Sequence, residues 1–195
     1  MVEISEEAHV AKALDFARAN GLRVSMAAIR HSMGGHAFDD NALVLDMRKF
    51  NKIELDAEAR TVTVQPGATS HAIQNVLHPR FAVKAMQSTD IFSVGGSISV
   101  NAHGMDHQVG SIAGTIRSLR VMLADGSVAS CSREENGDLF RHVVGGYGLF
   151  GVVLSATLDI TDNVVYRTSR EIIRSDDFPA YFAGQIEPNR NLGLF

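Results

Sequence analysis

A short stretch near the N-terminus gathers imidazole, guanidinium and glycine directly after an apolar segment. It is RVSMAAIRHSMGGHAF, residues 23–38, and it holds two histidines and an arginine around the pair Gly34-Gly35. Glycine admits backbone conformations that other residues avoid, and it lets a bound molecule approach the main chain closely. The stretch therefore predicts either a tight turn or a site where backbone and imidazole both meet a cofactor.

A second stretch, SVGGSISVNAHG at residues 93–104, places Gly95-Gly96 inside a run of β-branched and apolar residues. Paired glycines in such a run predict a strand and loop with a bulge, or a close approach by a ligand. Successive N–H groups beside the hydroxyls of Ser93 and Ser97 would form a nest for an anion such as a diphosphate.

A third stretch, GYGLFG at residues 146–151, is a literal G-x-G-x-x-G sequence. In a dinucleotide-binding Rossmann unit this motif follows a strand and opens a helix. Here the helix-like DLFRHVV precedes the motif and the strand-like VVLSATLDI follows it. The reversed order argues against a Rossmann unit. Two interpretations remain, a backbone that passes close to a ligand and a turn packed against a helix.

The chain offers little for metal binding or for nucleophilic catalysis. His103 and His107 are four residues apart, but Gly104 lies between them and no H-E-x-x-H motif is present. We find no P-loop and no G-x-S-x-G sequence. A single cysteine, Cys131, excludes an internal disulfide and a cysteine metal site. We therefore expect no metal.

The composition is that of a globular protein, because 45% of the 195 residues are hydrophobic. The formal net charge is -4 and the basic residues are scattered, which argues against a nucleic-acid partner. The N-terminus MVEISEEAHV lacks the pattern of a signal peptide, and no apolar run is long enough to span a bilayer. We expect a cytoplasmic protein without a membrane span.

Helical and strand patterns are mixed along the chain. Helices are expected from an N-cap at Ser5 to Asn20-Gly21, from Thr69 or Ser70 to 78, and over 135–144. Strands are expected over 22–27, 42–47 and 151–161, with hairpins over 51–67 and 116–132. This pattern favours an α+β fold with a substantial antiparallel sheet over a doubly wound parallel sheet. After Asp162, residues 164–175 predict one more strand and 176–188 a capped helix.

Several of these motifs occur in an order that resembles one known family. They are GLRVSMAAIRHSMGG, LVLDMRKFNKIELDAEARTVTVQPGAT, QSTDIFSVGGSISVNAHG, SLRVMLADGSV and ENGDLFRHVVGGYGLFGVVLSATLDIT. Over residues 6–162 the chain resembles the PCMH-type FAD-binding domain of the vanillyl-alcohol oxidase and p-cresol methylhydroxylase superfamily. The details VNAHG and ADG resemble the branch that includes decaprenylphosphoryl-ribose oxidase.

The resemblance implies two α+β subdomains with FAD extended between them, and a mixed or antiparallel sheet flanked by short helices. It implies an FAD-binding PCMH-type domain over 1–162 and the start of a truncated substrate (cap) domain over 163–195. It also implies an FAD-linked oxidoreductase whose flavin accepts a hydride from an alcohol-type small molecule, such as a sugar. The resemblance does not specify the electron acceptor. Because half of the flavin cradle would be absent, we expect weak FAD binding or none. The alternative is a non-catalytic remnant or nucleotide-binding module that keeps the fold.

The resemblance also carries over a set of cofactor contacts. The first loop would wrap the diphosphate and reach the flavin, the second stretch would line the diphosphate and the isoalloxazine, and the third would hold the adenine or ribose end. The implied cofactor-binding residues are Ala27, Ala28, Ile29, Arg30, His31, Ser32, Met33, Gly34, Gly35, Ser88, Ser93, Val94, Gly95, Gly96, Val100, Asn101, His103, Gly148, Gly151 and Val152. Tyr147, beside the glycines, either stacks on a ring or packs within the protein.

Two histidines keep alternative roles. His31 aligns where many relatives carry a histidine bonded covalently to the flavin, whereas the ribose oxidase branch has no bond there. This chain also has Ala27, Ala28, Ile29 and Arg30 where relatives usually have glycines. A covalent link and a hydrogen bond to the ring both remain open. His103 is the candidate catalytic residue that faces flavin and substrate, and its alternative is a histidine bonded to the loop backbone.

Overall fold

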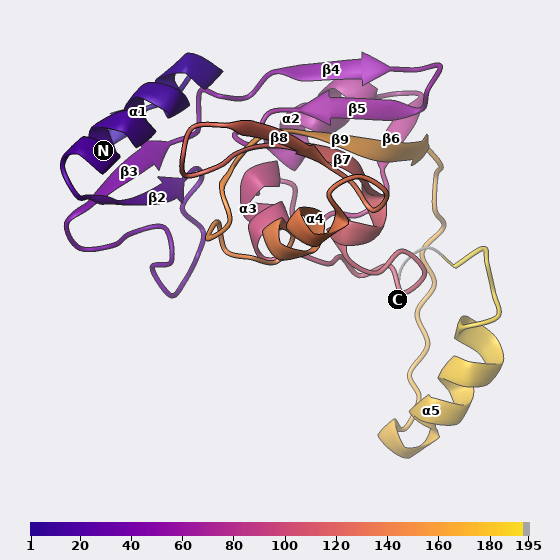
Figure 1. Ribbon diagram of the computed structural model, residues 1–195. Coiled ribbons are helices and arrows are strands. Elements are labelled where there is room, and N and C mark those ends of the chain that lie inside the picture. Colours follow the sequence, from indigo (N-terminus) through magenta and orange to yellow (C-terminus); the bar gives the residue numbers. More distant parts are fainter. Residues whose placement is uncertain (193–195) are drawn as a thin grey trace.

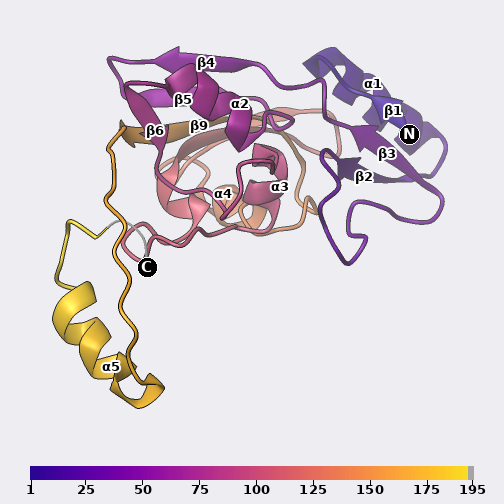
Figure 2. The same ribbon diagram turned by 180° about the vertical axis from the view of Figure 1, so that it is seen from behind.

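The computed structural model describes residues 1–192 and arranges a small parallel sheet beside a larger antiparallel one (Figures 1 and 2). The small sheet has the order β1 (Val2–Glu3), β3 (Ala42–Asp46) and β2 (Arg23–Ala27), and both of its pairings are parallel. Helix α1 (Glu7–Ala19) packs against this sheet. The large sheet has the strand order β4 (Ile53–Asp56), β5 (Thr61–Val64), β9 (Val152–Asp162), β7 (Ile116–Met122) and β8 (Val128–Cys131). The short strand β6 (Phe81–Val83) also pairs with β9.

The long strand β9 is common to the two hydrophobic cores. Its buried residues alternate with partly exposed ones, which is the pattern of a strand with one face on the core. Val152 and Leu154 pack with residues of α1 and β3, whereas Leu158 and Ile160 pack in the core of the large sheet. The strand therefore ties the small sheet to the large one.

Three short helices share the core of the large sheet. They are α2 (Ser70–Leu77), α3 (Val94–Ser99) and α4 (Gly137–Val143), and each contributes buried apolar side chains to that core. Helix α2 begins as the sequence predicts, because the Thr69 hydroxyl accepts a hydrogen bond from Ala72 N at 3.2 Å.

The structure confirms the predicted α+β class, and both hairpins are present. β4 and β5 pair with Leu55 opposite Val62. In the β7–β8 turn the Asp125 carboxylate accepts from Ser127 N at 2.9 Å, and Gly126 takes a left-handed φ of 88°. The parallel pairing of β1, β3 and β2 and the short strand β6 were not predicted.

The prediction of a strand around Gly95-Gly96 was wrong, because these residues lie in helix α3. The first turn of α3 is held by the loop between β5 and α2: Val94 N donates to Ala68 O at 2.8 Å and Gly95 N to Pro66 O at 2.9 Å. A Cβ on Gly95 would lie 2.7 Å from Pro66 Cβ, so a side chain there would clash. Gly95 therefore allows α3 to pack closely against Pro66. Such a long-range contact cannot be predicted from the strand or helix periodicity of the sequence.

The two ends of the chain differ from the expectation in smaller ways. Helix α1 begins at Glu7 with Glu6 as its N-cap, and the Ser5 hydroxyl contacts His9 Nδ1 at 3.3 Å instead of capping the helix. The strand predicted over 164–175 is absent, since residues 163–174 form no regular element and are exposed. No described strand pairs with them, and an extended segment needs such a partner to form a sheet.

The helix predicted over 176–188 is present in irregular form. A 3-10 turn (Ser175–Asp177), α5 (Phe178–Tyr181) and a π-helical turn (Phe182–Ile186) follow one another, and Figure 1 shows them away from both sheets. This segment contacts the loop after α3, where Gln108 Nε2 donates to Leu192 O at 2.6 Å. None of the helices within residues 1–192 is long and apolar enough to cross a membrane.

The shared strand yields a stability prediction. Leu154 of β9 is 0% exposed, so Leu154→Ala should lower the free energy of unfolding by about 2–5 kcal/mol through lost burial and a cavity. Leu55→Ala is the matched control, because Leu55 is 38% exposed and should cost less than about 1 kcal/mol. Urea unfolding at pH 7 measures both, and equal losses would contradict a central role for β9.

Candidate functional site

A cavity of about 650 Å³ lies where the three glycine-bearing stretches meet. Its walls are β2 with the loop that follows, helix α3, and the turn between α4 and β9. Cavities of this volume are typical of sites for small molecules and cofactors. Segments far apart in the sequence thus form one site.

The first wall is the loop that leaves β2, and it presents unpaired main-chain donors. Within residues 1–192, the backbone N–H groups from Ala28 to Gly34 donate to no protein acceptor. Unpaired N–H groups are costly unless water or a ligand accepts from them. A row of them at a cavity is suited to the oxygens of a phosphate.

The second wall is helix α3. Gly96 lines the cavity, and an added Cβ there would have one neighbour within 4 Å, Ser93 Oγ, in a tight contact at 3.2 Å. Two further lining side chains are paired with each other, because Gln87 Nε2 donates to Ser97 Oγ at 2.9 Å. This wall therefore places a backbone without a side chain beside a hydrogen-bonded pair.

The third wall is the turn before β9, where the left-handed backbone of Gly148 favours glycine and the turn contacts the side chain of Met26. Gly148 has a φ of 77°, and a Cβ there would lie 2.3 Å from Met26 Cε. Tyr147 is anchored to α3 by a bond from its N–H to Ser99 O at 2.9 Å. Tyr147 is 57% exposed, and its ring lies 5.7 Å from the ring of His36, centroid to centroid. Two aromatic rings from different walls thus meet at the cavity.

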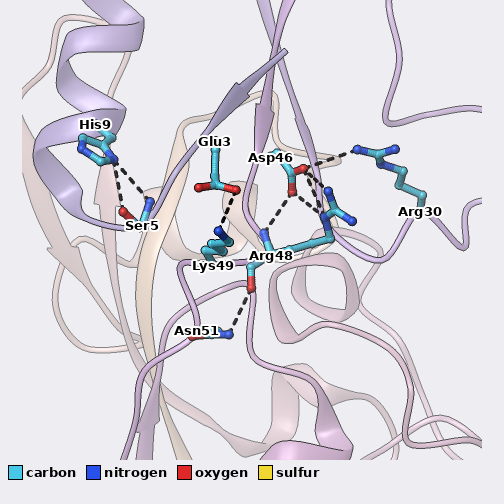
Figure 3. A network of polar contacts seen from close by, with 8 residues as sticks. All are labelled: Glu3, Ser5, His9, Arg30, Asp46, Arg48, Lys49 and Asn51. Carbon is cyan, nitrogen blue, oxygen red and sulfur yellow. Dashed lines mark hydrogen bonds and ion pairs between the residues drawn. The ribbon is translucent and has the colours of Figure 1, made fainter.

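A buried carboxylate supports the first wall (Figure 3). Asp46 ends β3 and is 6% exposed. Arg48 donates to it from Nη2 at 2.6 Å and from Nε at 2.9 Å, and Arg30 Nη2 lies 3.4 Å away. The hydrogen bond from the Arg48 side chain holds the pKa of Asp46 below its ordinary value, against the opposing effect of burial. Asp46 is therefore ionised at neutral pH and holds Arg30 beside the cavity.

The cavity takes in most of the residues that the sequence singles out. Those that line it are Ala27, Ala28, Ile29, Arg30, His31, Ser32, Met33, Gly34, Ser93, Gly95, Gly96, Val100, Gly148, Gly151 and Val152. Gly35, Ser88, Val94, Asn101 and His103 lie outside the lining. The contacts of all these residues with a cofactor stay predictions.

Local packing explains why some predicted residues face elsewhere. Val94 is buried in the core, and the Asn101 side chain accepts a hydrogen bond from Ala113 N at 3.2 Å. His103 is exposed, and its Nδ1 lies 2.9 Å from Gly104 O. This contact agrees with the alternative in which His103 bonds to the loop backbone. The position of His103 outside the cavity lining gives no support to a catalytic role.

His31 lines the cavity, and its ring nitrogens have no hydrogen-bond partner in the described chain. Its ring meets Phe92 edge-on at a centroid distance of 5.3 Å. An imidazole in this state serves equally as a nucleophile or as a hydrogen-bond partner. The geometry therefore agrees with both interpretations of His31.

Sequence reasoning missed several lining residues. Gln87 and Phe92 precede the glycine pair, and Pro66 precedes α2, but none of them has a residue type that signals a ligand. Met26 and Leu149 line the cavity as ordinary apolar side chains.

The chain can now be compared with known proteins. The family described as FAD binding domain matches residues 1–132. The chain belongs to this family. FAD is accordingly the cofactor of the domain, and the cavity fits it: unpaired N–H donors, open glycine backbone and one arginine meet the needs of a diphosphate.

Individual relatives support the assignment to FAD binding domains. An uncharacterised oxidoreductase of Rhodococcoides fascians is 31% identical over 156 residues, which are 79% of this chain and 35% of that protein. Decaprenylphosphoryl-beta-D-ribose oxidase of Mycolicibacterium smegmatis is 32% identical over 149 residues, 74% of this chain and 32% of that protein. The solved xylooligosaccharide oxidase of Myceliophthora thermophila, in complex with xylobiose, matches with a TM-score of 0.74 at 26% identity, over 81% of this chain and 34% of that chain. The chain spans about a third of the length of the two curated relatives.

The Asp46 network yields a pH prediction. Because the folded protein lowers the pKa of Asp46, the stability that this carboxylate contributes is present above about pH 4 and is lost as the pH falls through the lowered value. Asp46→Asn should cost roughly 1–3 kcal/mol at pH 7, with the difference from wild type shrinking in acid. Urea unfolding at pH 7 and at pH 3 measures this.

The control for that experiment is Asp15→Asn, because Asp15 pairs with Arg18 on the surface of α1 with its side chain 70% exposed. This change should alter stability little at either pH. A cost for Asp46→Asn that stays constant from pH 7 to pH 3 would contradict an ionised, stabilising Asp46.

Proposed function

We propose that this chain is the FAD-binding part of an oxidoreductase that oxidises a hydroxyl-bearing small molecule. The observation that carries the proposal is the single cavity formed by three glycine-bearing segments, with unpaired N–H donors on its first wall. Membership of the FAD binding domain family supplies the identity of the cofactor. The hydroxyl-bearing substrate is suggested by the names of the relatives, which include a ribose oxidase and a xylooligosaccharide oxidase.

In this proposal the residues of the chain bind and orient the dinucleotide. The loop from Ala28 to Gly34 and the open backbone at Gly96 hold the diphosphate, and the turn from Gly148 to Val152 holds the adenine or ribose end. Phe92 and Leu149 are apolar lining side chains that exclude water. His31 either bonds to the flavin or donates a hydrogen bond to it.

The bound FAD supplies a two-electron acceptor. The proposed reaction would convert a carbinol carbon to a carbonyl, with FAD as the group that could take up the hydride and a base that could take the hydroxyl proton. Within residues 1–192 the cavity offers His31 and His36 as groups able to take a proton. The proposal also includes a domain boundary at residue 162, with a substrate domain beginning at residue 163.

Blocking the cavity tests the proposal. Gly96→Leu places a side chain on the open backbone of α3, so it should weaken the binding of FAD and of ADP at least about tenfold. Isothermal titration calorimetry measures the ADP affinity, and quenching of flavin fluorescence measures that of FAD.

Gly184→Leu is the matched control, because no atom lies within 4 Å of a Cβ added there. This variant should bind as wild type, and thermal unfolding checks that both variants fold. Because half of the flavin cradle is expected to be absent, the ADP affinity decides the test. If wild type does not bind ADP, or if Gly96→Leu binds ADP as wild type does, the cavity is not the site of the diphosphate.

A further inference from the structure

We propose that Arg30 is the cation that compensates the charge of the cofactor's diphosphate, and this inference rests on the proposed function. Among the residues within 1–192 that line the cavity, Arg30 is the only arginine or lysine. A diphosphate in a cavity that partly excludes water needs a charged partner as well as neutral N–H donors. The contacts around Arg30 indicate that it is available for this role.

The buried carboxylate beside Arg30 is already neutralised by another residue. Arg48 makes three side-chain contacts with Asp46 at 2.6 to 3.1 Å, and its backbone N–H adds a fourth at 3.2 Å. Arg30 makes one contact with Asp46, at 3.4 Å. The charge of Arg30 is therefore in excess of what Asp46 requires.

The other contacts of Arg30 are weak. Its Nη2 lies 3.0 Å from Met1 Sδ, and sulfur is a poor acceptor. Its guanidinium carbon lies 5.9 Å from the centroid of the Phe38 ring. The one acid that lines the cavity, Asp39, is paired with Arg23 at 2.8 Å and does not compete for Arg30. A phosphate oxygen would be a stronger partner than any of these except Asp46.

The backbone of Arg30 provides an unusual way to test this role. Its φ is 64°, a left-handed conformation that glycine adopts more readily than arginine. Arg30→Gly thus removes the charge at a position where glycine suits the backbone. A loss of ligand affinity in this variant cannot be ascribed to a strained or misfolded loop, provided that its unfolding temperature is not lowered.

Arg60 supplies a control of the same kind. It has a φ of 54° and lies in the β4–β5 hairpin, where it pairs with Asp162 at 3.0 Å and does not line the cavity. Arg60→Gly is therefore the same change in the same backbone conformation at a distance from the site. Arg30→Lys is the third variant, because it keeps the charge.

The experiment measures affinities for FAD, ADP and adenosine by titration calorimetry at low and high salt. Arg30→Gly should weaken the binding of FAD and ADP roughly tenfold or more and reduce its dependence on salt, and should leave adenosine binding unchanged. Arg30→Lys should keep most of the affinity for ADP, and Arg60→Gly all of it.

Either of two results with Arg30→Gly would overturn the role of Arg30 and leave the proposed function standing: wild-type affinity for ADP, or equal losses for ADP and adenosine. Loss of ADP affinity in Arg60→Gly of the same size would do so too, since it would show a general effect of charge. If the wild-type chain binds neither FAD nor ADP, the proposed function fails and this inference fails with it.

Discussion

The main-chain N–H groups from Ala28 to Gly34 donate to no acceptor in the described chain, and these residues line the cavity, so they are free to bind water or a ligand. The rest of the site can be understood from this constraint. The parallel pairing of β2 with β3 sets where the loop begins, and Asp46 at the end of β3 holds Arg30 beside it. A phosphate-bearing ligand satisfies the donors and the arginine together, which a water-filled cavity does less well.

The other two walls of the cavity, helix α3 and the turn before β9, are brought to this loop by close packing at glycine residues. Gly95 allows α3 to meet Pro66, and Gly148 allows the turn before β9 to meet Met26. β9 then begins directly from that turn and runs through both hydrophobic cores. The site thus lies between two units that share a strand, so that the stability of the cores and the geometry of the cavity are linked.

Local patterns in the sequence were enough to predict the two hairpins, the start of α2 and the strand β9, because alternation, turn residues and capping act over a few residues. They failed at Gly95-Gly96, where a helix is favoured by contacts with Pro66 and Ala68 far back in the chain. They also failed at 164–175, where β-branched residues have no strand to pair with in the part of the chain that the structure describes. Glycine clusters predicted three walls of one cavity, but the side chains that complete it, such as Gln87 and Phe92, carry no signal of their own.

Amide hydrogen exchange with and without FAD tests the central claim most directly, because it observes the unpaired donors themselves. The account predicts that FAD slows exchange in residues 28–34 and around Gly96 and Gly148, while the exposed segment 163–174 exchanges as before. Protection that is absent from 28–34, or that is spread evenly over the chain, would contradict the claim that these main-chain donors hold the cofactor.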